Sequence, residues 1–210
     1  MTLAEQTYQA LRRDILDGVF EPGRPLRLDA LKARYGAGFS PLREALNRLQ
    51  AERLVTAAPL RGFSVAPLSA AAMWDAIETR ILIETDALRR SIARGGDDWE
   101  AAVVAALHAL RLQSGRGDPE ALEARHLAFH MALIGASDSV WLTDFATQLY
   151  AATERYRRPA LARIGSARDL QAEHGVLADA ALARDADTAC ARLSEHYRDT
   201  GRAVERALAA

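Results

Sequence analysis

The chain has 210 residues, a formal net charge of −1 at pH 7 and a single cysteine, Cys190. This length accommodates one large domain or two small ones, each able to bury a core. The lone cysteine excludes an intramolecular disulfide. The sequence contains neither a signal peptide nor an apolar run of membrane-spanning length, so we expect a soluble cytoplasmic protein.

The charge is distributed unevenly along the chain. Residues 1–68 hold ten Arg and Lys against seven Asp and Glu, a net +3, and the remainder holds seventeen against twenty-one, a net −4. A mildly basic N-terminal part is compatible with phosphate contact. It does not establish nucleic-acid binding, because the geometry of a patch matters more than its sum.

Two helices are predicted before residue 38. Thr2 and Glu5 form a capping box that opens the first, and Gly18 stops it. Residues 20–25 have the composition of a turn, and a short helix over 28–35 follows. The basic side chains of this region, which could contact phosphate or stay in solvent, are Arg12, Arg13, Arg27 and Lys32.

A third helix is predicted over residues 39–54. We expect Ser40 to cap its start and Pro41 to occupy its first turn. Apolar residues recur on one face, at Leu42, Ala45, Leu46 and Leu49. The outward face carries Arg43, Glu44, Asn47 and Arg48. Such a helix suits the major groove of DNA, although a charged outer face is also ordinary for a surface helix.

Two short strands, over residues 54–57 and 63–66, flank a hairpin tip at 59–62. The order helix, helix, helix and two-stranded wing predicts a winged helix-turn-helix domain over residues 1–68, whose third helix enters the major groove. The predicted DNA-contacting residues are Arg27, Ser40, Pro41, Arg43, Asn47, Arg48, Arg61 and Gly62.

This region resembles the GntR family of bacterial transcription regulators. The matching residues are Phe39-Ser40-Pro41-Leu42-Arg43-Glu44-Ala45-Leu46, Arg61-Gly62-Phe63 and Val65. The chain departs from the family motif by lacking a small polar or basic residue between Ser40 and Pro41. The resemblance implies a homodimeric, ligand-responsive repressor on a palindromic double-stranded operator, rather than an enzyme.

From residue 69 onward the sequence has no strand pattern. Six helical segments are predicted, over residues 70–94, 98–113, 119–136, 138–158, 166–184 and 186–208. Pro119 suits the first turn of the third segment, Pro159 is expected to stop the fourth, and Ser166 is expected to cap the fifth. We therefore predict a mainly α protein, with an all-α antiparallel bundle over residues 69–210.

Four of the five histidines have spacings that could bring them together. His126 and His130 lie four residues apart, on one helix face. His174 and His196 each lie eleven residues from Asp185, so in an antiparallel hairpin they come level. Three helices could then present four imidazoles to one point, as a metal site requires. A single histidine is more often an ordinary surface or core residue.

The C-terminal part resembles the FCD ligand-binding domain of the FadR-type branch of the GntR family, in which an Asp and three His hold a metal. His130, His174 and His196 match the three family histidines, and His126 occupies the Asp position. His108 matches none of them, and we expect it to be exposed or structural. Four nitrogen ligands favour Zn or Ni over the harder ions that carboxylates bind.

The resemblance also implies a small carboxylate or dicarboxylate effector. Residues 83–90 and 40–46 resemble a subgroup that includes a glutarate-responsive, carbon-starvation-induced regulator. Arg80, Arg155 and Tyr156 are the candidate effector-binding residues, since arginine binds carboxylates in a bidentate manner. Arg80 could instead pair with Glu84 within its helix. Tyr150 and Trp141 are expected to be core aromatics.

Two other functions fit parts of the sequence. In a metal sensor, the ion itself would be the signal. In a metal-dependent hydrolase, three His around an open metal position would activate water, with Glu173 or Glu195 as the candidate base. The hydrolase leaves the N-terminal motif unexplained, so we favour the effector-responsive regulator.

Overall fold

The computed structural model describes residues 2–59, 62–164 and 169–209, without the side chains at 159–164 and 208–209. Contacts divide the chain into two compact units. The N-terminal unit consists of Met1–Trp74, Ala151–Ile164 and Val204–Ala210, and the helical unit consists of Asp75–Tyr150 and Gly165–Ala203. Within the described ranges, no helix combines the length and apolar character needed to cross a bilayer.

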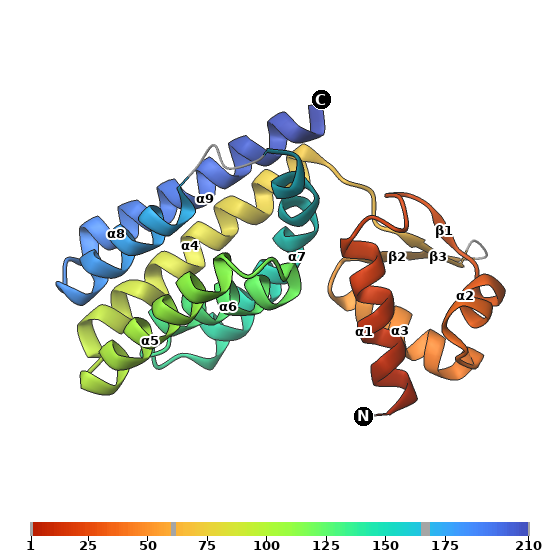
Figure 1. Ribbon diagram of the computed structural model, residues 1–210, viewed down its shortest axis with the longest axis horizontal. Helices are drawn as coiled ribbons and strands as arrows, with labels where there is room; N and C mark the ends of the chain where they lie inside the picture. Colours follow the sequence, from red (N-terminus) through yellow and green to blue (C-terminus); the bar gives the residue numbers. More distant parts are fainter. Residues whose placement is uncertain (1, 60–61, 165–168, 210) are drawn as a thin grey trace. The chain divides into compact units, whose positions relative to one another are not determined.

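As far as residue 65, the described part of the N-terminal unit forms three helices and a small antiparallel sheet (Figure 1). The helices are α1 (Leu3–Leu16), α2 (Leu28–Tyr35) and α3 (Phe39–Ala51). The strands are β1 (Pro25–Leu26), β2 (Val55–Ala58) and β3 (Gly62–Val65), in the order β1-β3-β2. The predicted winged helix-turn-helix fold is thus confirmed.

Local signals explain where α1 begins and where α2 ends. The Thr2 hydroxyl accepts a hydrogen bond from the Glu5 amide at 3.1 Å, as the predicted capping box requires. Gly36 ends α2 with φ at +65°, a left-handed conformation that glycine adopts without strain.

The strand β1 lies where the sequence indicated only a turn. Pro25 pairs with Ser64 and Leu26 with Phe63, which adds a third strand to the wing. A two-residue strand is too short to show a period-two pattern. Burial of the Leu26 side chain in the core of the unit fixes it in place.

The start of α3 also differs from the prediction. Gly38, not Ser40, is the N-cap residue, and it provides no side-chain hydrogen bond. Ser40 and Pro41 therefore lie inside the first turn. Proline is tolerated there because first-turn amides have no partner within the helix. The predicted apolar stripe is confirmed, since the four side chains are 0% exposed, namely Leu42, Ala45, Leu46 and Leu49.

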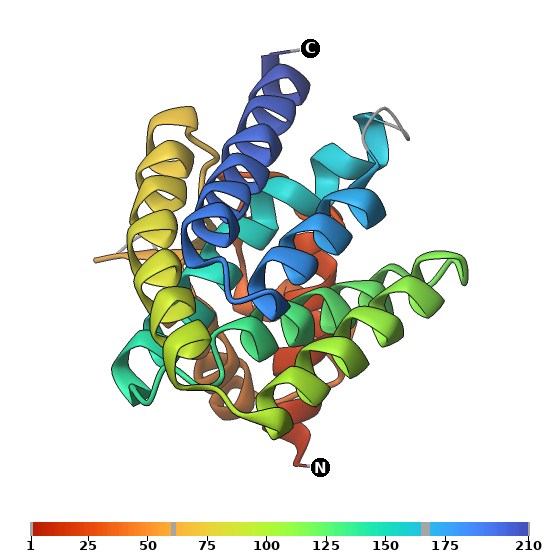
Figure 2. The same cartoon turned by 90° about the vertical axis from the view of Figure 1, so that its left-hand side faces the viewer.

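The remaining helices form the predicted all-α bundle. They are α4 (Ala70–Arg94), α5 (Asp97–Ser114), α6 (Pro119–Leu133), α7 (Val140–Ile164), α8 (Leu170–Leu182) and α9 (Ala186–Ala209). Both views show α8 and α9 side by side as a hairpin, with α5 against α6 (Figures 1 and 2). The two compact units do not divide the chain at a single point, because α7 contributes residues 151–164 to the N-terminal unit. The domain boundary at 68/69 therefore stays a prediction.

Several predicted helix limits were wrong. Helix α7 runs past Pro159 to Ile164, because a proline removes one helical hydrogen bond without ending a helix that packing holds. The Asp169 side chain caps α8 by accepting from the Ala172 amide at 3.0 Å. Ser166, the predicted cap, lies outside the described residues. Helix α6 ends at Leu133 rather than 136.

Candidate metal centre and nucleic-acid interface

Four histidine side chains converge inside the helical unit. His126 and His130 come from α6, His174 from α8 and His196 from α9, and all four are buried. One ring nitrogen of each lies within 4.8 Å of the others. The ring centroids of His174 and His196 are 4.8 Å apart, as expected for positions equidistant from a hairpin turn. His108 is exposed.

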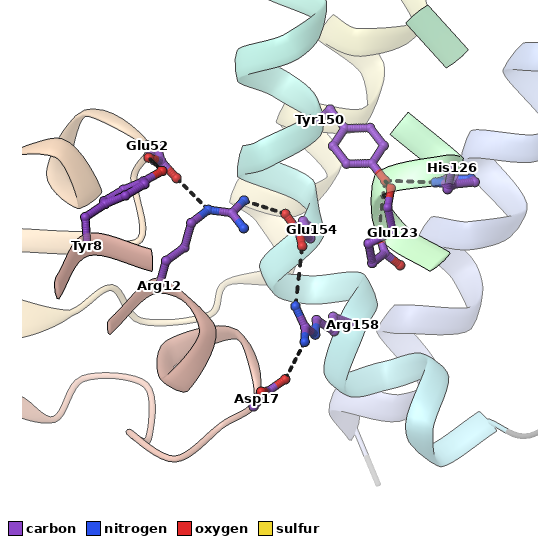
Figure 3. Close-up of polar contacts among 9 residues, drawn as sticks. All are labelled: Tyr8, Arg12, Asp17, Glu52, Glu123, His126, Tyr150, Glu154 and Arg158. Carbon is purple, nitrogen blue, oxygen red and sulfur yellow. Dashed lines mark hydrogen bonds and ion pairs between the residues drawn. The ribbon is translucent and has the colours of Figure 1, made fainter. Parts of the chain in front are cut away.

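A tyrosine that is itself bound to a carboxylate holds the outer nitrogen of His126. The Tyr150 hydroxyl, on α7, lies 3.0 Å from His126 Nδ1 and 2.9 Å from Glu123 Oε2 (Figure 3). Since the hydroxyl can donate its proton to the carboxylate, it accepts from His126 Nδ1. His126 then carries its proton on Nδ1 and presents the Nε2 lone pair to the cluster.

A second tyrosine holds His130 in the same way. The Tyr197 hydroxyl donates to Glu84, accepts from Arg80 Nη2 at 3.0 Å and lies 2.9 Å from His130 Nδ1. Burial raises the pKa of Tyr197 well above its ordinary value, against the opposing effect of Arg80, so the hydroxyl keeps its proton. His130 therefore also presents Nε2 as a lone pair.

His196 has a carboxylate as its outer partner, with Nδ1 2.9 Å from Glu173 Oε2. Three of the four rings thus have an outer hydrogen bond of the kind that orients metal-binding histidines. The Nε2 atoms of His126 and His130 lie 3.2 Å apart. Two nitrogens on one tetrahedral zinc, each at about 2.0 to 2.1 Å, lie roughly 3.3 Å apart. The donor set therefore fits a divalent ion.

The three candidate effector residues occupy different places. Arg80 is buried and pairs with Glu84, and its Cζ atom lies 4.9 Å from the centroid of the Tyr150 ring and 4.1 Å from that of the Tyr197 ring. Arg80 thus reaches the histidine cluster through Tyr197. Its pairing with Glu84 is the alternative that the sequence left open.

Arg155 and Tyr156 belong to the N-terminal unit instead. The Arg155 guanidinium donates to the carbonyls of Arg53 at 2.9 Å and Pro67 at 3.3 Å, and to the Tyr156 hydroxyl at 2.6 Å. A carboxylate bound there would have to displace these contacts. Trp141, expected in the core, is 73% exposed, which corrects that prediction.

The outer face of α3 presents the predicted DNA-contacting residues. Ser40, Arg43 and Asn47 are exposed on this helix, and Pro41 is partly buried. Arg48, also on α3, forms an ion pair with Glu5 of α1 at 2.7 Å.

The other predicted DNA contacts lie outside α3. Arg27 is exposed just before α2. In the wing, Gly62 opens β3 with φ at +75°, a conformation that favours glycine. Arg61 lies outside the described residues.

Arg12, which the sequence offered as a candidate for phosphate contact, forms ion pairs with carboxylates. It binds Glu52 at 3.0 Å and Glu154 at 2.6 Å, and Arg158 joins Glu154 to Asp17 (Figure 3). This ion-pair cluster connects α1 to the second half of α7 within the N-terminal unit.

Sequence reasoning missed the outer partners of the histidines. Two of them have a local signal, since Glu123 lies three residues before His126 and Tyr197 directly follows His196. Glu173 directly precedes His174 and was considered only as the base of a hydrolase, whereas Glu84 has no local signal as a partner of the cluster. Glu195, one candidate base for a hydrolase, pairs with Arg192 at 3.0 Å.

Comparison with known proteins gives two consecutive family matches. Residues 3–65 match the bacterial regulatory proteins of the gntR family, and residues 75–199 match the FCD domain. The HTH-type transcriptional regulator BphR of Paraburkholderia xenovorans is 41% identical, over 93% of this chain and 82% of that protein. The HTH-type transcriptional repressor GlaR of Escherichia coli is 36% identical, over 90% of each chain.

Solved structures share the fold. E. coli McbR/YncC gives a TM-score of 0.79 at 21% identity, over 98% of both chains. A GntR protein from Rhodococcus sp. RHA1 gives a TM-score of 0.76 at 20% identity, over 96% of both.

Proposed function

Because this chain belongs to the GntR family of bacterial regulatory proteins, in the branch with an FCD domain, we propose that it is a repressor released from DNA by a small carboxylate. Its role as a DNA-binding transcription regulator follows from the family. The repressor role is supported by the likeness to GlaR. The observation that carries the effector and metal part is the convergence of four buried imidazoles with outer hydrogen-bond partners.

The proposed DNA contact is made by α3 and the wing. Arg43 contacts the duplex from the exposed face of α3, with Ser40 and Asn47 beside it. The other proposed DNA-contacting residues are Pro41, Arg27, Arg61, Gly62 and Arg48, and Arg48 would have to exchange its ion pair with Glu5 for the DNA. A homodimer places two such helices on the half-sites of a palindrome. Light scattering on the full chain should give a mass twice 22.9 kDa.

The proposed metal ligands are His126, His130, His174 and His196, and Zn or Ni suits four nitrogen donors best. When bound, such an ion supplies a positive charge and a coordination position for an anion. Tyr150, Tyr197 and Glu173 orient three of the rings and fix their tautomers. The Arg80 guanidinium, whose charge is balanced by Glu84, contacts the cluster through Tyr197.

The charge of the bound ion favours a carboxylate as effector. Glutarate and related dicarboxylates are the first candidates, because residues 83–90 and 40–46 resemble the glutarate-responsive subgroup. The Arg80 guanidinium already binds Glu84, so a carboxylate would compete with Glu84 for it. A metal-responsive regulator is the alternative, in which the ion itself alters DNA affinity.

We infer that α7 transmits the state of the cluster to the DNA-binding helices. Tyr150 on α7 contacts His126, and Glu154 lies one helical turn further on the same helix. Glu154 binds Arg12 of α1, which packs against the recognition helix α3. A shift of α7 at Tyr150 would thus act on α1. A coupling of about 1 to 3 kcal/mol would change DNA affinity roughly 5- to 150-fold.

The test measures affinity for a DNA duplex selected in vitro from a random pool by the full-length protein. Affinity is compared for metal-stripped protein, for protein reloaded with Zn or Ni, and for each form with glutarate. Release by glutarate that requires metal supports the proposal. A change on adding metal alone identifies a metal sensor, and no response to either overturns the effector role.

A further inference from the structure

Phe39 is a large apolar side chain that the fold leaves open at the start of the recognition helix. It is the first residue of α3 and is 45% exposed, whereas the apolar stripe of the same helix is fully buried. Phe39 lies about one turn before Leu42, on the same side of the helix. It therefore extends the apolar stripe past the edge of the core.

The position of Phe39 on α3 places it with the DNA-contacting residues. At 3.6 residues per turn, Phe39, Ser40, Arg43 and Asn47 fall within an arc of roughly 100° around the helix. Phe39 and Arg43 are four residues apart and therefore neighbours on this face. The Lys32 ammonium lies 5.1 Å from the centroid of the Phe39 ring, which places a cation beside it.

The major groove offers one apolar group to such a side chain. Thymine presents a 5-methyl group there, next to its O4 acceptor, and apolar side chains read it by contact. A phenyl ring cannot hydrogen-bond a base edge, so contact with this methyl is the readout available to it. A helix that enters the groove by its N-terminal end brings its first residue close to the bases.

We propose that Phe39 is a specificity-determining residue that packs against the 5-methyl group of one thymine in each half-site. This inference rests on the proposed DNA contact through α3. It assigns to Phe39 a direct role in choosing the sequence, while Arg43 supplies the polar contact one turn further along. The neighbouring Lys32 is placed to neutralise a phosphate beside that base.

The test removes the methyl group without altering base pairing. In a duplex selected by the wild-type protein, each thymine in turn is replaced by deoxyuridine, and affinity is measured by gel shift. One position per half-site should lose affinity roughly fourfold, as expected for one buried methyl group, and roughly fifteenfold when both half-sites are changed. In Phe39→Ala, thymine and deoxyuridine at that position should bind equally.

Matched variants separate this contact from a general loss of binding. Val19→Ala removes an apolar side chain of similar exposure, 43%, from the same unit and should keep the full methyl effect. Arg43→Ala should bind more weakly yet keep the ratio between thymine and deoxyuridine. Phe39→Leu, which keeps an apolar group, should retain part of the ratio, and thermal melts verify that every variant is folded.

The outcomes distinguish this inference from the function on which it rests. If the wild-type protein selects no DNA sequence, the proposed function fails, and this inference fails with it. If it selects a sequence but no thymine shows a methyl effect, or Phe39→Ala keeps that effect unchanged, the role of Phe39 is refuted while DNA binding stands.

Discussion

Glu154 and Arg12 lie 142 positions apart in the sequence, and their side chains meet at 2.6 Å with the Glu154 side chain only 5% exposed. The same Arg12 guanidinium binds Glu52, whose carboxylate also accepts a hydrogen bond from the Tyr8 hydroxyl (Figure 3). Burial, together with Glu52, raises the pKa of Tyr8 to about 12. The cluster thus joins α1, the end of α3 and α7 through one buried carboxylate, Glu154, and two partly buried side chains, Arg12 and Glu52.

Replacing Glu154 by Gln should weaken this connection. The change leaves Arg12 partly buried with a single carboxylate, so we expect the free energy of unfolding to fall by about 1 to 3 kcal/mol. Glu78→Gln is the matched control, because Glu78 forms an exposed ion pair with Arg198 and should cost less than about 1 kcal/mol. Urea unfolding measures both, and equal losses would contradict a special role for Glu154.

Glu154→Gln should also separate DNA binding from effector response. The α3 surface is untouched, so affinity for the selected duplex should stay within about threefold of wild type. The ratio of affinities with and without effector should fall toward one, because the ion pair that links Glu154 of α7 to Arg12 of α1 is removed. A variant that responds as wild type does would rule out this path.

Replacing Arg43 by Ala should cost about 1 to 3 kcal/mol of DNA-binding free energy if Arg43 contacts a base, or lower the salt slope by about one if it contacts a phosphate. Gel-shift titration at several salt concentrations separates the two. Arg192→Ala, in the helical unit, is the control and should change neither. Unchanged affinity and salt slope in Arg43→Ala would remove α3 as the recognition helix.

Loss of a cluster histidine should release the metal and destabilise the helical unit. An ion that binds only the folded state, present at a concentration of 100 times its Kd, adds about 2.7 kcal/mol to the free energy of unfolding. Elemental analysis and thermal melts of His130→Ala should show both losses, and exposed His108→Ala should show neither. If wild-type protein purified without chelator holds no metal and does not shift its Tm with Zn or Ni, the histidines are structural.

His126 can be examined separately. His126→Ala should have a smaller effect than His130→Ala, and His126→Asp should keep the metal. The added negative charge beside the ion should weaken binding of an anionic effector. Isothermal titration with glutarate measures this, and tighter binding by His126→Asp would contradict the charge argument.

The outer tyrosines should matter for metal affinity although neither would touch the ion. Tyr150→Phe and Tyr197→Phe each remove the hydroxyl that holds a ring in its tautomer, so we expect metal affinity to fall about 10- to 100-fold. Competition with a coloured chelator measures this. Tyr35→Phe removes a hydroxyl bonded to Asp14 in the N-terminal unit and should leave metal affinity unchanged.

Local patterns in the sequence were enough to predict much of the fold. The end of α2 follows from Gly36, and the apolar stripe of α3 from its helical spacing. The convergence of His174 and His196 followed from their equal distance to the hairpin turn. Each of these depends on residues that are close in sequence or related by one simple geometric rule.

The features that sequence reasoning missed depend on distant partners. The short strand β1 is fixed by β3, nearly forty residues later, and nothing in Pro25 or Leu26 alone indicates it. Pro159 suggested the end of α7, but packing of the preceding turns carries the helix onward. The pairing of Arg12 with Glu154 is likewise visible only once α1 and α7 are placed.

The buried pair Arg80 and Glu84 restricts how this protein can change over generations. Removing either residue alone leaves an uncompensated charge inside the bundle, at a cost of about 3 to 5 kcal/mol. A whole domain has only about 5 to 15 kcal/mol of stability. Replacing both by apolar residues can be close to neutral, but the single mutant between them is disfavoured. We therefore expect these two positions to change together, or one after the other only once a stabilising mutation elsewhere has offset the loss.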